Sequence, residues 1–473
     1  MDQQPKMCTG DRLSCEQGRS LRDRVPRSMH AAWEVKEGRT GPLELLNEQA
    51  QQRLAYLIPE RYLRMSASPF AFFRGGALTM AADLAHTPNT GVLVHACGDA
   101  HLANFGGFAS PERHLVFDIN DFDETAVGPW EWDIKRLAAS IEICGRDRGF
   151  KPSWCRGAVR STVASYREAM NTFSHMGALD VCYAQLDVEE VLTKALVSSS
   201  RKEARSVRNK LAKAYRKTNT RAFEKYLRRD NGEVRIAFDP PYLVPLDRFA
   251  PVADANHVAA SLVELLAGYR NSLAPELQCL FDRYTYIDAA QKVVGVGSVG
   301  TRAWIVAFAD EQTGDPLVLQ VKEAQESVLE RFAGSCLLSS HGQRVVHGQR
   351  LMQASSDVLL GYTSAVDESG RLRDYYVRQL WDWKTSTDLD IATSAEIEAL
   401  GRLCGWTLAR AHARSGNRFA IAGYLGTGAS FDRALVEFAS SYADQNEADF
   451  RMFIDALSGG SLTTGGVVKF EAC

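Results

Sequence analysis

The stretch KVVGVGSVGTRAWIVAFADEQTGDPLVLQVKEA, residues 292–324, decides the fold that the sequence predicts. Glycines stand at 295, 297 and 300, and the following TRAWIVAF is rich in aromatic and β-branched residues. A Gly-Asp-Pro turn at 314–316 arrives before a crossover helix could form, and PLVLQVKEA then has the composition of a strand. The stretch therefore predicts strand, glycine-rich turn, strand, turn and strand.

The pattern G-x-G-x-x-G serves two kinds of nucleotide site. In a dinucleotide-binding unit it turns a strand into a helix whose N-terminus holds pyrophosphate. In a kinase it joins two strands and covers the phosphates of ATP. Because strands flank GVGSVG on both sides, we favour the kinase-type hairpin, with Gly295, Gly297, Ser298 and Gly300 as nucleotide-binding residues. Lys322, at the end of the next strand, is then expected to bind the α- and β-phosphates, the alternative being a surface lysine.

Two loops nearer the N-terminus collect polar side chains between apolar flanks, in HACGDAHLANFGGF (95–108) and LVFDINDFDET (115–125). Phosphoryl transfer needs a carboxylate that orients the attacking hydroxyl, and an amide and a carboxylate that hold Mg²⁺. Asp118 is expected to be structural. The site residues that we expect are Asp99, His101 and Lys322 for catalysis, and Asn104, Asp121 and Asp123 for Mg²⁺.

A third segment, YYVRQLWDW (375–383), follows a strand and precedes a helical region, which is the position of a kinase hinge. We expect backbone groups near Gln379 and Leu380 to bind the adenine of ATP. Arg74, beside the aromatic residues of SPFAFFRG (68–75), is expected to form a structural ion pair rather than to contact an anion.

Motifs in these loops resemble known proteins. GDAHLANFG and INDFDETAVGPWEWDIKRLAAS are similar to the catalytic and metal loops of aminoglycoside phosphotransferases and related small-molecule kinases. This resemblance implies that Asp121 is the metal-binding carboxylate and that buried Asp133 braces the catalytic loop. SPFAFFRG, CGDAHLANFG, FDINDFDET, GVGSVGTR and YVRQL together resemble the DUF2252 family of uncharacterised bacterial proteins, over roughly residues 45–450.

The order of the motifs differs from that of kinases, in which the glycine-rich loop and the lysine precede the catalytic loop. Here Asp99 and Asp121 come first, and LCGWTLARAHARSG (403–416) resembles the helix that normally leads into the catalytic loop. We therefore expect a circularly permuted, two-lobed α+β kinase-like fold, in which helix 396–414 ends near His95. The candidate partners of the lysine are Glu326, Glu330, Gln349 and Gln353.

The 473 residues are long enough for two or three domains or lobes. We expect a polar N-terminal arm at 1–42, part of a large helical lobe with the catalytic and metal loops at 43–180, and a helical insertion with a basic helix at 181–283. A small β-rich nucleotide-binding lobe at 284–385 and C-terminal helices at 386–473 complete this prediction. DPPYLVPLD (239–247) has the proline content of a linker.

Composition excludes several classes of protein. The net charge of −3 and the apolar content of 45% are ordinary for a soluble protein, and no apolar run is long enough to span a membrane. The basic stretch 201–229 lacks a regular pattern of aromatic residues, so we expect a solvated face and no nucleic-acid partner. Ten scattered cysteines without a C-x-x-C pair predict free thiols in the cytoplasm, with Cys97 in the core.

The sequence thus predicts a phosphotransferase that uses ATP and Mg²⁺ and acts on a hydroxyl of a small molecule or protein, with no inferable protein partner. Two alternatives stay open. One is a metal-dependent phosphohydrolase with His95, Asp99, His101, Asp118 and Asp121 around two metals. The other is a nucleotide-binding pseudokinase without catalytic activity.

Overall fold

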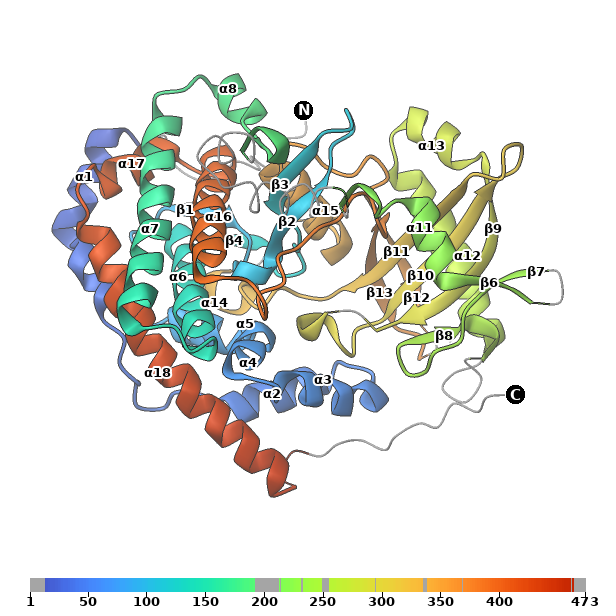
Figure 1. Cartoon of the computed structure of the whole chain (residues 1–473), viewed down its shortest axis with the longest axis horizontal. Coiled ribbons are helices and arrows are strands. Elements are labelled where there is room, and N and C mark those ends of the chain that lie inside the picture. Colours follow the sequence, from blue (N-terminus) through green and yellow to red (C-terminus); the bar gives the residue numbers. More distant parts are fainter. Residues whose placement is uncertain are drawn as a thin grey trace.

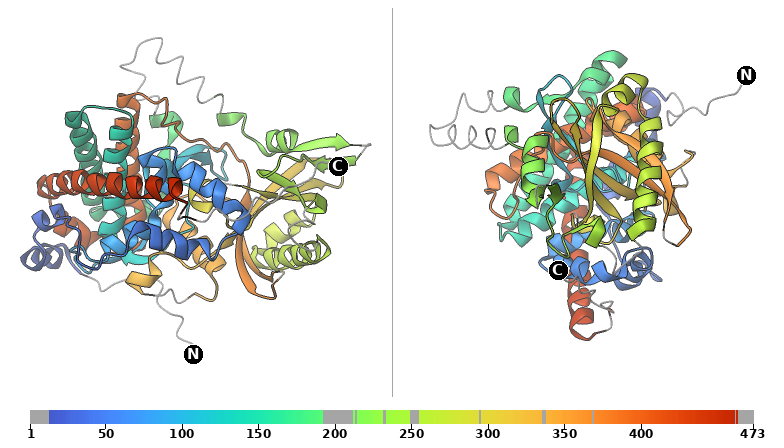
Figure 2. Two further views of the ribbon diagram at one scale, coloured as in Figure 1. Left: turned by 90° about the horizontal axis from the view of Figure 1, so that it is seen from below. Right: turned by 90° about the vertical axis from the view of Figure 1, so that its right-hand side faces the viewer.

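A computed structural model describes residues 13–191, 212, 214–230, 233–248, 255–293, 295–334, 338–367, 369–460 and 462. The chain forms a mixed α+β structure with two parts, a bundle of helices and a six-stranded sheet (Figure 1). Seen from below, the two parts again lie on opposite sides (Figure 2). The predicted α+β class is therefore correct. None of the helices in the described ranges is long and apolar enough to cross a membrane.

Four long helices form the centre of the helical part: α6 (Trp130–Asp147), α7 (Pro152–Ser174), α16 (Ser394–Ser415) and α18 (Ser430–Ser458). Nearly every side chain of α6 is buried, because α7, α16 and α18 all pack around it. Gly401 and Gly405 allow α16 to lie directly against α7, since a Cβ at either position would overlap Thr162. This close approach fixes where α16 ends.

Smaller helices surround this centre. They are α1 (Cys15–Arg24), η1 (Arg27–Ala31), α2 (Pro42–Ala50), η2 (Ala55–Leu57), α3 (Ile58–Met65), α4 (Pro69–Gly75), α5 (Ala77–Leu84), α8 (Ala178–Tyr183) and α17 (Arg418–Leu425). The N-terminal segment is not the loose arm that the sequence predicts. Ser14 caps α1, and Gly18 of this helix lies against Ala420 of α17. Residues 1–12 of the predicted arm lie outside the described residues.

The sheet runs in the order β12-β13-β11-β10-β9-β8, with antiparallel neighbours throughout. Its strands are β8 (Leu243–Pro245), β9 (Tyr284–Lys292), β10 (Ala303–Asp310), β11 (Pro316–Ala324), β12 (Gly361–Val366) and β13 (Leu372–Gln379). The glycine-rich turn joins β9 to β10, which confirms the predicted hairpin. Side chains alternate along β10, so Val306 and Phe308 face one hydrophobic cluster and Ile305 and Ala307 face another.

Both faces of the sheet are covered. Helices α12 (Ala255–Ser272) and α13 (Pro275–Phe281) bury Tyr269 and Phe281 against one face. Helix α11 (Asn219–Tyr226), with β6 (Leu227–Asp230) and β7 (Glu233–Ile236), covers the other. The predicted insertion at 181–283 thus belongs largely to the sheet, and the predicted linker contains its edge strand β8, where Pro245 is tolerated. Most of the basic stretch 201–229 before α11 lies outside the described residues.

Short strands carry the two polar loops. Strand β1 (Leu93–Ala96) pairs with β4 (Ala126–Pro129), and β3 (Leu115–Ile119) pairs with β2 (Phe105–Ala109) and β5 (Leu186–Asp187). The 3-10 turns are η3 (Leu102–Asn104), η4 (Leu246–Arg248) and η5 (Val296–Ser298). Helix α14 (Glu330–Ala333) contacts β4, and α15 (His341–Met352) packs on β12, β13 and α16, so it connects the sheet to the helical part.

Candidate functional site

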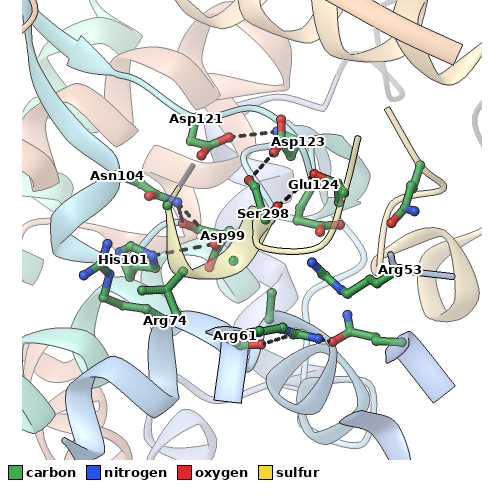
Figure 3. Close-up of a pocket in the computed structure, with 18 of the residues that line it drawn as sticks. Arg53, Arg61, Arg74, Asp99, His101, Asn104, Asp121, Asp123, Glu124 and Ser298 are labelled. Carbon is green, nitrogen blue, oxygen red and sulfur yellow. Dashed lines mark hydrogen bonds and ion pairs between the residues drawn. The ribbon is translucent and has the colours of Figure 1, made fainter. Parts of the chain in front are cut away.

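A cleft of about 820 Å³, open solvent included, lies where the two polar loops meet the glycine-rich turn (Figure 3). Asp99, His101 and Asn104 line it from the first loop, and Asp121 and Asp123 from the second. The turn contributes Gly295, Gly297 and Ser298, and α2 to α4 contribute Gln49, Arg61 and Arg74. Residues that the sequence separates widely therefore share one cleft.

The backbone of the Asp99 loop is fixed from behind by Asp133 of α6. Asp133 Oδ2 accepts from the Cys97 N–H at 2.6 Å, and Oδ1 accepts from the Gly98 N–H at 2.9 Å. His412 Nε2 lies 3.1 Å from Asp133 Oδ2. Gly98 has φ +80°, and a Cβ there would overlap the carbonyl of Glu124. The prediction that Asp133 braces this loop is confirmed.

Asp99 itself is held on three sides. Arg136 Nε lies 2.6 Å from Asp99 Oδ1, and Asn104 Nδ2 donates to the Asp99 carbonyl at 2.7 Å and to Oδ2 at 3.2 Å. His101 Nε2 is 3.6 Å from Oδ2. Burial first, and Arg74 and Arg136 next, lower the pKa of His101 well below its usual value, so its ring is neutral. The Asp99 carboxylate is thus fixed in orientation at the cleft wall.

Asp123 is the centre of a second group of contacts. Lys322 Nζ lies 2.5 Å from Asp123 Oδ2, Ser298 Oγ donates to the same oxygen at 3.0 Å, and Tyr376 OH donates to Oδ1 at 2.6 Å. Lys322 is also 3.9 Å from Asp121 Oδ1. Because Lys322 is 3% exposed, the alternative of a surface lysine is wrong. The lysine lies behind the cleft and connects the loop of Asp121 and Asp123 to β11.

The charges of this group depend on one another. Burial disfavours the charge of Lys322, but Asp121 and Asp123 outweigh it and raise the pKa of the ammonium. Burial also acts against the Asp123 carboxylate, yet Lys322 and Tyr376 hold its pKa at about 2. Burial and the neighbouring Asp123 raise the pKa of Asp121. Asp121 is therefore the carboxylate that an additional cation would stabilise.

The side chains that the sequence offers as partners of Lys322 have other contacts. Gln349 Nε2 donates to Gln353 at 3.1 Å, and Gln353 Nε2 donates to the Ile119 carbonyl at 2.7 Å. Glu330 accepts from the Ser327 N–H at 3.0 Å, and Glu326 lines the cleft. Asp123, which is not among these candidates, is the ion-pair partner of Lys322.

The glycine-rich turn lies against the helices that precede Asp99. Gly300, at φ +92°, packs on the side chain of Arg53, and its carbonyl accepts from the Leu54 N–H at 2.8 Å. A Cβ on Gly297 would lie 3.7 Å from the Arg74 carbonyl. Three of the four predicted turn residues line the cleft, and Gly300 anchors the turn from outside.

Gln379 and Leu380 are not brought into this cleft. They line a separate pocket of about 480 Å³ with Asp357 and Lys384. The Gln379 N–H donates to Asp357 at 2.6 Å, and the Leu380 N–H donates to the Val318 carbonyl at 2.9 Å. Both amides are therefore engaged within the protein.

Other expectations concern side chains outside the cleft. Asp118 is buried in an ion pair with Arg410, in agreement with a structural role. Ser415, the last residue of α16, donates to the His95 carbonyl at 3.3 Å, so this helix ends beside β1 as predicted. Cys97 is fully buried, and burial raises the pKa of its thiol. The described cysteines are unpaired.

Sequence reasoning missed several residues of the site. Arg136 and Tyr376 lie within quoted motifs, but nothing in those motifs assigns them a role, because their partners Asp99 and Asp123 are distant in the sequence. Of the three arginines that line the cleft, Arg74 is the one that lies in a quoted motif, SPFAFFRG. The ion pair that the sequence predicts for it is wrong. Within the described chain, the side chain of Arg74 has no hydrogen bond or ion pair, and its Nε is buried.

Comparison with known proteins identifies a family for this chain. The family model described as "Uncharacterized protein conserved in bacteria (DUF2252)" matches residues 53–456. The chain belongs to this family. No curated protein and no solved structure matches the chain.

Proposed function

We propose that this protein is a phosphotransferase that moves the γ-phosphoryl group of ATP, with Mg²⁺, to a hydroxyl of a small molecule or protein. One observation carries the proposal. The side chains of Asp99, Asn104 and Asp121 meet the glycine-rich turn in a single cleft, with Lys322 behind them. This is the set of groups that phosphoryl transfer requires.

The order of the sheet elements supports a kinase-like lobe. Strands β9 and β10 flank the glycine-rich turn, β11 carries Lys322, and α15 precedes β12 and β13. Kinases present a glycine-rich loop, a lysine on the third strand and then a helix in this order. The end of α16 beside β1 is what a circular permutation of such a fold would produce.

The donor set fits Mg²⁺. Asp121, Asp123 and Asn104 offer hard oxygen atoms, and Asn104 Oδ1 has no hydrogen-bond partner among the described residues. No three His, Cys, Asp or Glu side chains of the described chain form a metal site by themselves. This suits an ion that is held in part by nucleotide phosphates. When bound, Mg²⁺ would neutralise charge on those phosphates.

The protein's own groups would position the reactants. Asp99, fixed by Arg136 and Asn104, would accept a hydrogen bond from the acceptor hydroxyl and take its proton. The amides of the glycine-rich turn would cover the phosphates. Lys322 would bind them after exchanging its contact with Asp123, and Tyr376 would remain on that carboxylate.

A pseudokinase is the second candidate. It is favoured by the pairing of Lys322 with Asp123 and by the engaged amides of Gln379 and Leu380. The phosphohydrolase has less support, because His95 and Asp118 are not among the residues that line the cleft.

The two candidates differ in turnover. We would measure Mg²⁺–ATP binding by thermal shift, and ATP hydrolysis or phosphate transfer, in wild type, Asp99→Asn and Asp121→Asn. Asp187→Asn, outside the cleft, is the control. Asp99→Asn should keep binding and lose ~10²–10⁴-fold in rate, whereas Asp121→Asn should also weaken binding. Unchanged hydrolysis in both variants would reject this cleft as the catalytic site, and tight ATP binding without hydrolysis in wild type would establish the pseudokinase.

A further inference from the structure

Three arginines line the cleft on the side opposite the metal loop. Arg53 precedes η2, Arg61 lies on α3 and Arg74 lies near the end of α4. Figure 3 shows them along one edge of the pocket, with Asp121 and Asp123 along the other. The proposed function uses none of them.

Arg61 is the most enclosed of the three. Its side chain is 1% exposed, and Nη2 donates to Gln49 Oε1 at 2.9 Å and to the Gly75 carbonyl at 3.1 Å. Its Nε and Nη1 are buried without any hydrogen-bond partner in the described structure. A guanidinium carries five N–H donors, so three of those of Arg61, one on Nε and two on Nη1, lack an acceptor among the described residues beside the cleft that this residue lines.

Arg53 and Arg74 repeat this pattern. Arg53 Nη1 donates to the Val299 carbonyl at 2.5 Å, but its Nε is buried without a partner. The side chain of Arg74 makes no hydrogen bond or ion pair with any described residue. Burial lowers the pKa of all three arginines, and the proximity of Arg53 adds to this effect at Arg61.

Three acidic residues of the cleft have partners of their own. Glu323 lies within salt-bridge distance of Arg302 and Arg373, Asp123 is paired with Lys322, and Glu124 accepts from the Val328 N–H. A buried cation without a partner is costly, and so is a buried donor without an acceptor. An oxyanion between these guanidinium groups would supply both the charge and the acceptors that are lacking.

We propose that Arg53, Arg61 and Arg74 form an oxyanion subsite, which binds a phosphate or carboxylate group of the acceptor substrate. The assignment to the acceptor rests on the proposed function. In that function Asp121, Asp123 and Lys322 serve the nucleotide on the opposite wall, whereas Asp99 serves the acceptor. Arg136, which pairs with Asp99, donates to the carbonyl of Phe73, the residue before Arg74, at 3.1 Å, so the subsite lies on the acceptor side.

The subsite defines a class of substrate. The acceptor carries a hydroxyl that reaches Asp99 and an anionic group that reaches the arginines. A polyamine would meet three guanidinium groups at this edge of the cleft. The resemblance to aminoglycoside phosphotransferases therefore does not extend to the acceptor.

Inorganic phosphate tests the subsite directly. We would measure its effect on the melting temperature of wild type, Arg61→Met, Arg74→Gln and the control Arg64→Met. Arg64 lies on the same helix, pairs with Glu60 and does not line the cleft. Phosphate should stabilise wild type and Arg64→Met, and its apparent Kd should weaken about 10- to 100-fold in the other two variants. Arg74→Gln keeps the test valid should Arg61→Met not fold.

Repeating the titration with saturating Mg²⁺ and a non-hydrolysable ATP analogue identifies the source of the anion. Continued stabilisation by phosphate supports the acceptor, whereas its loss shows that the arginines hold a nucleotide phosphate and overturns the assignment. Should the analogue not bind while phosphate still depends on Arg61, the oxyanion subsite stands and the proposed function fails. An equal phosphate effect in wild type and both cleft variants, or none in wild type, would overturn the subsite.

Discussion

Replacement of Asp133 by asparagine should loosen the Asp99 loop without removing any residue that lines the cleft. The Asp133 carboxylate uses both oxygens, one for the N–H of Cys97 and one for the N–H of Gly98. Asparagine keeps one oxygen and places an NH₂ group where the other oxygen was. One of the two buried amides therefore loses its acceptor and meets a donor instead.

The size of the effect follows from these contacts. A hydrogen bond to a charged group contributes ~1.5–3 kcal/mol, and the orphaned amide adds its own desolvation cost. We expect the loop to open at a free-energy cost that is ~2–3 kcal/mol smaller than in wild type. Because every 1.4 kcal/mol is tenfold, local exchange should become roughly 30- to 150-fold faster.

Hydrogen exchange read by mass spectrometry on peptides that cover 95–105 measures this directly. Glu131→Gln is the matched control. Glu131 lies two residues earlier on α6, is as deeply buried, and accepts from the Thr90 N–H at 2.7 Å through one oxygen that glutamine retains. Exchange over 95–105 should be unchanged in this control. Unaltered exchange in Asp133→Asn would refute the view that Asp133 holds the loop.

Two further predictions concern charge and pH. Burial raises the pKa of Glu124 to about 7, so the folded protein binds this proton more tightly than the unfolded chain and loses stability as pH rises from about 4.5 through 7. The melting temperature of Glu124→Gln should therefore exceed that of wild type at pH 8, and exceed it by little at pH 4.5. The same difference in melting temperature at both pH values would contradict the argument. Lys322→Met removes the cation that pairs with Asp123, and the free energy of unfolding in urea should fall by about 3–5 kcal/mol at pH 7.5. The fall should be smaller at pH 4.5, because Asp123 can then take up a proton. The double variant with Asp123→Asn should recover part of the lost stability. An equal loss in the single and double variants would show that the pair does not contribute through charge.

Local patterns predicted much of the secondary structure. The aromatic and β-branched composition of 301–308 and the turn at 314–316 led to β10 and β11, and the resemblance of 403–416 to a helix that leads into a catalytic loop led to α16. The prolines of 239–247 misled, because an edge strand accepts a proline that a central strand would reject. The polar composition of the N-terminal segment also misled, since α1 docks through Gly18 and needs few large apolar side chains.

The sequence by itself determined which residues were candidates for the cleft: carboxylates and an amide between apolar strands, and a glycine-rich turn between two more. These signals are local, because a strand or a tight turn depends on near neighbours. Only the tertiary structure decided the partners, such as Asp123 for Lys322 and Arg136 for Asp99, and left buried donors of Arg61 without an acceptor among the described residues. Those contacts depend on how α3, α4, α6 and the sheet pack together, and no local pattern records a pairing between residues that the chain separates so widely.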